Sequence, residues 1–169
     1  MLQAAQVAAL PVPRGRSRCG DAGRVAYLRA MTSAVRDLRL WQETVALCGD
    51  AVRLAVAASR RERKAVTDAV VRASAALALA VADGCARYEP GEQRRSFAHA
   101  RRALVGLETV LAVGRRAGVL PEARCAELVA RHAALSKLLA GVTAYVERQV
   151  ELADAERRRT AGVGGRGAG

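Results

Sequence analysis

Apolar residues recur at steps of three and four along four stretches of the chain, and this spacing predicts four amphipathic helices. We expect the first from about residue 34, the second over about 61–85, a third after a turn at 83–92 and the fourth over about 121–158. No stretch alternates with the period of two that marks a strand. The expected apolar stripes, helix by helix, are Leu38, Trp41, Val45, Cys48, Val52 and Ala55; Val66, Val70, Ala73, Leu77 and Val81; Phe97, Ala100, Leu104, Leu107, Leu111 and Gly114; and Leu128, His132, Leu135, Leu139, Val142 and Val146.

Cap and turn residues fit the same division. Thr32 or Ser33 can cap the first helix, Gly118 suits a left-handed helix terminus, and Pro121 suits the first turn of the next helix. Because the loops are short, an all-α, antiparallel up-and-down four-helix bundle over residues 34–158 is the expected fold. Residues 1–33 are expected to form a flexible basic leader, of which residues 1–30 are untranslated if Met31 is the initiator, and residues 159–169 a disordered glycine-rich tail.

The composition is rich in small apolar residues and in arginine. Hydrophobic residues make up 51% of the 169 residues but aromatic ones 3%, so alanine, valine and leucine must fill the core. The formal net charge is +12, and Lys64 and Lys137 are the lysines, so nearly all the positive charge is guanidinium. No apolar run approaches the roughly 20 residues of a membrane span. We therefore expect a soluble, cytoplasmic protein without a membrane partner.

Candidate catalytic and metal-binding chemistry is sparse. Cys48 and Cys85 lie among apolar residues and are expected in the core, and the four cysteines form no C-x-x-C pair. His99 and His132 lack a cysteine or carboxylate at a nucleophile or metal spacing, so each is interpreted as a structural histidine. Bundle dimetal sites need Glu-x-x-His motifs, which the sequence lacks. The sequence predicts no enzyme, no metal and no cofactor.

Clustered positive charge is the remaining signal. Guanidinium clusters bind polyanions through counterion release, largely without sequence specificity. Basic residues at a helix N-terminus oppose the helix dipole, so residues 60–64 carry the most weight. In an up-and-down bundle we expect the start of the second helix and the end of the third at opposite ends, so the clusters need several copies to merge. The predicted RNA-binding or DNA-binding residues are Arg60, Arg61, Arg63, Lys64, Arg94, Arg95, Arg101 and Arg102. The alternative is an interaction module whose partner is an acidic protein surface.

Four segments, in order and at matching spacing, carry a family resemblance. "RDLRLWQ" at 36–42 resembles a D-L-x-V-W-Q signature, and "AVADGCAR" at 80–87 resembles N-I-A-E-G-x-G-R. "ARRALVGLETVL" at 100–111 is similar to A-x-G-S-L-x-E-L-E-T-x-L, and "AGVLPEA" at 117–123 matches the turn between the third and fourth helices. These motifs belong to the bacterial four-helix-bundle family of intervening-sequence proteins from large-subunit ribosomal RNA genes. The same family includes the accessory variability determinant of diversity-generating retroelements.

The resemblance has implications that the residue patterns alone do not supply. For the retroelement branch it implies a homopentamer that binds nucleic acid, associates with a reverse transcriptase and has no catalytic activity. The residue patterns favour the bundle and the polyanion affinity but give neither a subunit number nor a partner. Trp41, in this interpretation, is a packing residue. The retroelement and ribosomal branches both stay open.

Overall fold

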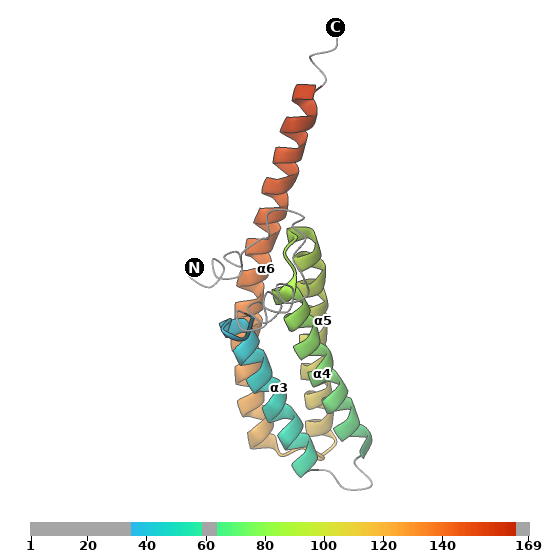
Figure 1. Ribbon diagram of the computed structural model, residues 1–169. Coiled ribbons are helices and arrows are strands. Elements are labelled where there is room, and N and C mark those ends of the chain that lie inside the picture. Colours follow the sequence, from blue (N-terminus) through green and yellow to red (C-terminus); the bar gives the residue numbers. More distant parts are fainter. Residues whose placement is uncertain (1–34, 59–63, 165–169) are drawn as a thin grey trace, which may run out of the picture.

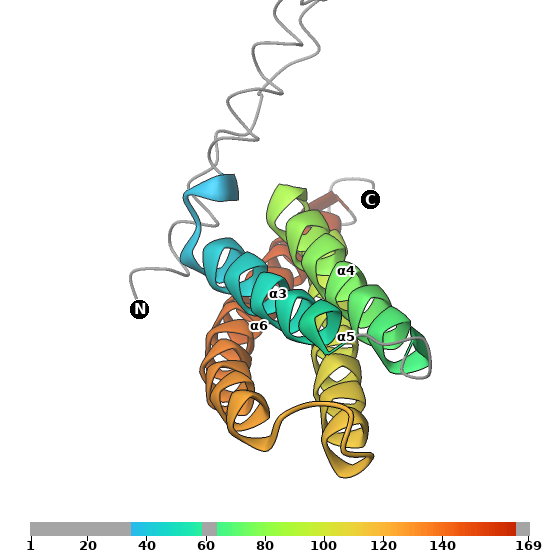
Figure 2. The ribbon, with the colours of Figure 1, turned by 90° about the horizontal axis from the view of Figure 1, so that it is seen from below.

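A computed structural model describes residues 35–58 and 64–164, and within those ranges the chain forms four α-helices (Figure 1). They are α3 (Arg39–Ala57), α4 (Lys64–Ala86), α5 (Pro90–Arg116) and α6 (Glu122–Gly164). Successive helices run antiparallel, and Figure 2 shows α3 lying beside α4 and α6. The predicted up-and-down four-helix bundle is confirmed. The predicted leader at residues 1–33 lies outside the described residues, which begin at Val35.

Two helix boundaries differ from the prediction. The first helix does not run unbroken from residue 34, because Leu38 has an extended backbone (φ −74°, ψ 124°) and α3 begins at Arg39. The Gln42 side-chain amide donates to the Arg36 carbonyl oxygen at 3.0 Å and bridges this break. At the other end of the chain α6 continues to Gly164, six residues beyond the predicted residue 158, and extends past the other three helices (Figure 1).

The core confirms the predicted stripes of α5 and α6 in full. Each of their twelve predicted residues is buried, with Phe97, Ala100, Leu107 and Val146 entirely inaccessible to solvent. In α4 the predicted residues Val70, Leu77 and Val81 are buried, while Val66 and Ala73 pack at the edge of the core. Because α4 contributes mostly alanine and valine, the helices approach closely around leucines from α5 and α6.

The predicted stripe of α3 was wrong in phase. Leu38, Cys48 and Ala55 are buried, but Val45 is 41% exposed, and Trp41 and Val52 are half-buried. The buried face is rotated by about one residue, because the core uses small side chains and a threonine whose hydroxyl donates to the Leu40 carbonyl at 2.7 Å. The buried residues of α3 are Leu40, Thr44, Leu47, Cys48, Ala51 and Ala55.

The displaced apolar residues of α3 adjoin an exposed apolar flank of α4. Val45 and Val52 lie three and four residues from Cys48, whose thiol contacts the Ala78 backbone of α4. Leu79 follows Ala78 directly and is 70% exposed. We call this surface the α3–α4 apolar face; its members are Val45, Val52, Val56, Val71 and Leu79.

Helix α4 is strongly apolar, although much of its surface is not buried in the bundle. Among the described helices, α4 is long and apolar enough by length and composition to cross a membrane, with a mean hydropathy of 1.6 over its most apolar 18 residues. The expectation that no apolar run approaches a membrane span was therefore wrong for α4. Only 22% of that window is buried in the bundle. The remaining apolar surface is what forms the α4 side of the α3–α4 apolar face.

The closest helix packing lies between α4 and α5. A Cβ atom added to Gly84 would lie 2.6 Å from Cε1 of the Phe97 ring, so any larger residue would displace that ring. Phe97 is fully buried, and neighbouring side chains hold its ring in place. This contact fixes which side of α5 faces the core.

The turn between α5 and α6 follows the predicted chemistry. Gly118 has φ +66°, the left-handed conformation expected of it, and its amide donates to the Arg115 carbonyl oxygen at 3.0 Å. The Val119 and Leu120 amides both donate to the Gly114 carbonyl. Pro121 lies one residue before α6, and its carbonyl oxygen accepts from the Cys125 amide at 3.1 Å. The loop therefore ends α5 and starts α6 within a few residues.

Replacing Gly84 with alanine should destabilise the bundle by about 1–3 kcal/mol, because the added methyl group overpacks the Phe97 ring. The matched control is Gly106→Ala on α5, where an added Cβ meets nothing within 4 Å. That control should stabilise the helix by about 0.5–1 kcal/mol. Urea unfolding of the two variants measures both changes, and equal effects of the two would refute the packing argument.

Candidate nucleic-acid interface

Four arginines predicted from the sequence lie together on the solvent side of α5. Arg94, Arg95, Arg101 and Arg102 are all exposed; Arg95 and Arg102 lie on the side of α5 away from Phe97 and Leu104, and Arg94 and Arg101 lie on the adjoining flank. Positions seven residues apart, such as Arg94 and Arg101 or Arg95 and Arg102, lie on nearly the same side of a helix. The four therefore cover two turns of one helix face. We call them the arginine face.

Two residues of the arginine face, Arg101 and Arg102, line a shallow depression. Its volume is about 440 Å³, and it is lined by Ala98, Arg101, Arg102 and Val105. Small apolar side chains thus follow the midline of the face, with a guanidinium group on each side. The nearest carboxylates along α5 are Glu92 and Glu108, and each has another contact: Glu92 accepts from Arg87 at 3.2 Å, and Glu108 lies 3.5 Å from His132.

The guanidinium groups of the arginine face are unpaired. Within residues 35–58 and 64–164, none of the four forms an ion pair or a side-chain hydrogen bond. Several other arginines do form such pairs, for example Arg39 with Glu43 at 3.7 Å and Arg124 with Glu127 at 2.8 Å. An unpaired arginine offers all its donors to an incoming anion without first breaking an internal contact.

The second predicted cluster is described in part. Arg60, Arg61 and Arg63 lie outside the described residues, while Lys64 is exposed at the first position of α4. The structure does not bring Lys64 together with the arginine face, because α4 starts at the end of the bundle opposite to the start of α5 (Figure 1).

The expected separation of the start of the second helix from the end of the third was wrong. A Cβ atom added to Gly114, near the end of α5, would lie 3.0 Å from the Val66 side chain near the start of α4. The physical reason is that α4 and α5 are antiparallel neighbours, so the start of one lies beside the end of the other. Arg115 at this end is paired with Glu122 at 3.1 Å. Positive charge here is thus partly neutralised within the chain.

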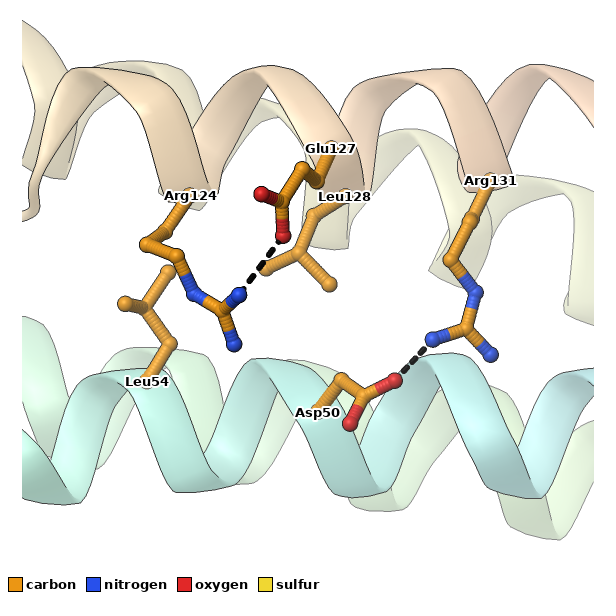
Figure 3. Close-up of a pocket in the computed structure, with 6 residues that line it drawn as sticks. All are labelled: Asp50, Leu54, Arg124, Glu127, Leu128 and Arg131. Atoms are coloured by element: carbon orange, nitrogen blue, oxygen red, sulfur yellow. Dashed lines mark hydrogen bonds and ion pairs between the residues drawn. The ribbon is translucent and has the colours of Figure 1, made fainter.

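A polar pocket between α3 and α6 shows the opposite arrangement, with its charges paired. Its volume is about 250 Å³, and Figure 3 shows Arg131 pointing at Asp50 across the two helices and Arg124 turned toward Glu127. Asp50 also pairs with Arg53. Leu54 and Leu128 complete the lining. This pocket joins α3 to α6 and leaves little uncompensated charge for a ligand.

A network of side chains holds the turn between α4 and α5, next to the arginine face. Ser96 donates to Asp83 at 2.5 Å, and Arg87 donates to Asp83 at 3.0 Å. The Gln93 amide donates to the Arg87 carbonyl oxygen at 2.8 Å. The hydrogen bond from Ser96 lowers the pKa of Asp83 below its usual value, and the hydrogen bond and positive charge of Arg87 lower it further. The carboxylate therefore stays charged and keeps α5 anchored at its first turns.

The histidines and cysteines have structural environments. His132 is buried, with Nε2 3.2 Å from the Leu104 carbonyl oxygen, which confirms it as a satisfied core histidine. His99 is exposed, so burial does not support its interpretation as a structural histidine. Burial confirms Cys48 and Cys85 as core residues and raises their pKa values to about 11 and about 12, so both thiols are protonated at neutral pH. Within the described part of the chain, no group of three or more potential ligands could hold a metal ion.

Comparison with known proteins gives one family. Residues 36–141 match the model of a family described as 23S rRNA-intervening sequence protein. The matched range contains α3, α4, α5 and the first half of α6, and it includes the whole arginine face. No curated protein and no solved structure matches the chain.

Acid should remove the contribution of Asp83 to stability. Because folding lowers its pKa, the carboxylate stabilises the bundle at pH values above its unfolded pKa of about 3.9, and this contribution is lost as the pH falls through the folded value. The melting temperatures of the wild type and Asp83→Asn should differ by a constant amount between pH 5 and 8, and the difference should shrink below pH 4. A constant difference down to pH 2 would contradict the network.

Proposed function

The chain belongs to the family of 23S rRNA-intervening sequence proteins, and from this membership and the arginine face we propose that it is a non-enzymatic nucleic-acid-binding bundle. It contacts the phosphate backbone of RNA or DNA through Arg94, Arg95, Arg101 and Arg102. Binding is largely independent of base sequence, because phosphate contacts carry no sequence information directly.

The observation that carries this proposal is the set of unpaired guanidinium groups on one helix face. A protein that neutralises several phosphates releases the counterions condensed on them, which supplies affinity without a shaped pocket. Arginine also matches the phosphate group with two parallel hydrogen bonds. The fixed rotation of α5, set by Phe97 against Gly84, keeps the four side chains on the solvent side. An acidic protein surface is the alternative ligand for the same face.

Self-association through the α3–α4 apolar face is a second part of the proposal. A soluble chain seldom exposes adjoining large apolar side chains without a partner for them, and Val56 and Leu79 are 57% and 70% exposed. The borders of the face carry both signs of charge, with Asp68 and Arg72 on α4. A uniformly acidic or basic partner would therefore meet repulsion, whereas a second copy of the chain presents both signs. The arginine face is on α5 and stays free when α3 and α4 are covered.

The finer biological role rests on the motif resemblance. By that resemblance the assembly is a homopentamer that assists the reverse transcriptase of a diversity-generating retroelement. The gene's surroundings distinguish the two branches of the family. A neighbouring reverse transcriptase gene with a variable repeat would support the retroelement role, whereas a position inside a 23S ribosomal RNA gene would overturn it.

Neutralising the arginine face should weaken nucleic-acid binding and flatten its salt dependence. Four phosphate contacts give a slope of log K against log salt of about −3.6, so the R94Q/R95Q/R101Q/R102Q variant should lose about that amount of slope on a DNA duplex. The measurement is a fluorescence anisotropy titration between 50 and 200 mM salt.

The matched control is R39Q/R53Q/R124Q/R157Q, which removes the same four positive charges from arginines that are already paired within the chain. It should keep most of the slope. If both quadruple variants lost affinity equally, net charge rather than the arginine face would be responsible. Binding by neither the variants nor the wild type would sink the nucleic-acid proposal, and an acidic protein would become the leading candidate.

Placing a charge on the α3–α4 apolar face should break the assembly. L79E should reduce the light-scattering mass of the multimer toward the 17.8 kDa of one chain, because two copies cannot bury a carboxylate there without a partner. L152E is the matched control, since Leu152 is a 59% exposed leucine on α6. A wild-type monomer would overturn the assembly, and a monomer that floats with lipid vesicles would assign the face to a membrane surface instead.

A further inference from the structure

We infer that the arginine face takes double-stranded nucleic acid in preference to single strands, with one row of arginines following each strand. The inference rests on the proposed function and names the class of ligand for the same site. It depends on three features of the described residues: the arrangement of the arginines in two rows, the shallow apolar midline between the rows, and the positions of the aromatic side chains.

The four arginines form two rows along α5. Arg94 and Arg101 make one row, and Arg95 and Arg102 make the other. Within a row the positions are about 10.5 Å apart along the axis and lie within about 20° of each other around it. The rows are about 100° apart, so at the surface of a helix about 10–12 Å wide they are separated by roughly 8–9 Å. Two parallel lines of positive charge match two phosphate backbones better than one.

The rows lie on either side of an apolar midline on α5. Their midline carries Ala98 and Val105, with the latter 60% exposed. The depression between the rows is shallow, and the described residues that line it all belong to α5, so among the described helices no neighbour supplies a wall that could enclose a single strand. A helix of this shape fits a groove between two strands, as an α-helix fits the roughly 12 Å wide major groove of B-form DNA. On an RNA duplex the same rows would reach phosphates across the wide minor groove.

Among the described residues, no fully exposed aromatic side chain lies near these rows to serve as a platform for unpaired bases. Proteins that hold single strands without sequence preference stack successive bases on aromatic side chains. Within the described ranges, Phe97 is fully buried, and Trp41, Tyr88 and Tyr145 are half-buried. Of these four, Phe97 is on α5, and its ring faces Gly84 in the core. A single strand on this surface would therefore gain phosphate contacts but little stacking.

The two kinds of ligand should differ in salt dependence. A duplex can engage both rows and four phosphates, which gives a slope near −3.6. A single strand can follow one row at a time and engage two phosphates, which gives a slope near −1.4. Between 50 and 200 mM salt the affinity for duplex should fall about 150-fold, and the affinity for a single strand about 7-fold. Duplex RNA and duplex DNA share the paired-backbone chemistry that the inference requires.

The experiment titrates the full chain with four fluorescent 24-mers: an unstructured single strand and its duplex, each as RNA and as DNA. We expect tighter binding and the steeper slope on duplex, and the two duplexes show whether the source of the paired backbone is RNA or DNA. The row variants R94Q/R101Q and R95Q/R102Q should each reduce the duplex slope by about half. The control R39Q/R53Q removes two charges from paired arginines, and circular dichroism confirms that every variant is folded.

The outcomes separate this inference from the proposed function. Equal or tighter binding of the single strand, or a loss confined to one of the two rows, would overturn the duplex preference while nucleic-acid binding stands. No binding of any probe at 50 mM salt would overturn both. Tighter duplex binding with an unchanged slope in both row variants would move the duplex site away from the arginine face and would also refute the inference.

Discussion

The close packing of the Phe97 ring against Gly84 is the constraint on which the rest of the molecule depends. With no Cβ on Gly84, α4 and α5 approach until the ring fills the space between them. That contact sets the rotation of α5, and the same helix then buries Leu104, Leu107 and Leu111. The arginine face then lies on the solvent side of α5 as a geometric consequence. The close approach at Gly84 therefore holds α5, and with it the arginine face, at one rotation.

The sequence predicts the buried face of a helix correctly where that helix has a single apolar side. In α5 and α6 the apolar residues form a single line, and the predicted stripes are the buried ones. In α3 the periodicity is equally clear, but there are two apolar lines, and periodicity cannot say which one faces the core. The structure buries the line that contains Thr44. Its hydroxyl donates to the Leu40 carbonyl oxygen, so it can be buried like a small apolar residue. The other line, with Val45 and Val52, became part of the α3–α4 apolar face.

The sequence predicts which arginines cluster in the candidate site, but not which of them are free of carboxylate partners. The sequence identifies Arg94, Arg95, Arg101 and Arg102 as a cluster on one helix. Whether an arginine is free depends on carboxylates that are distant in the chain, as with Arg131, whose partner Asp50 lies on another helix. Sequence spacing cannot reveal that pairing. What separates the arginine face from the other basic residues is that four unpaired arginines share two turns of one helix.

The apolar and basic surfaces lie on different helices, so the proposed assembly leaves the arginines exposed to a polyanion. Assembly would multiply the arginine face and strengthen binding through avidity without any new kind of contact. The central claim is that this face binds phosphate backbones by releasing counterions. The most direct measurement is the affinity of the wild-type chain for a duplex across a series of salt concentrations. The account predicts a linear fall of log K with log salt, with a slope of about −3.6 or steeper. An affinity that does not change with salt, or no binding at 50 mM salt, would contradict it.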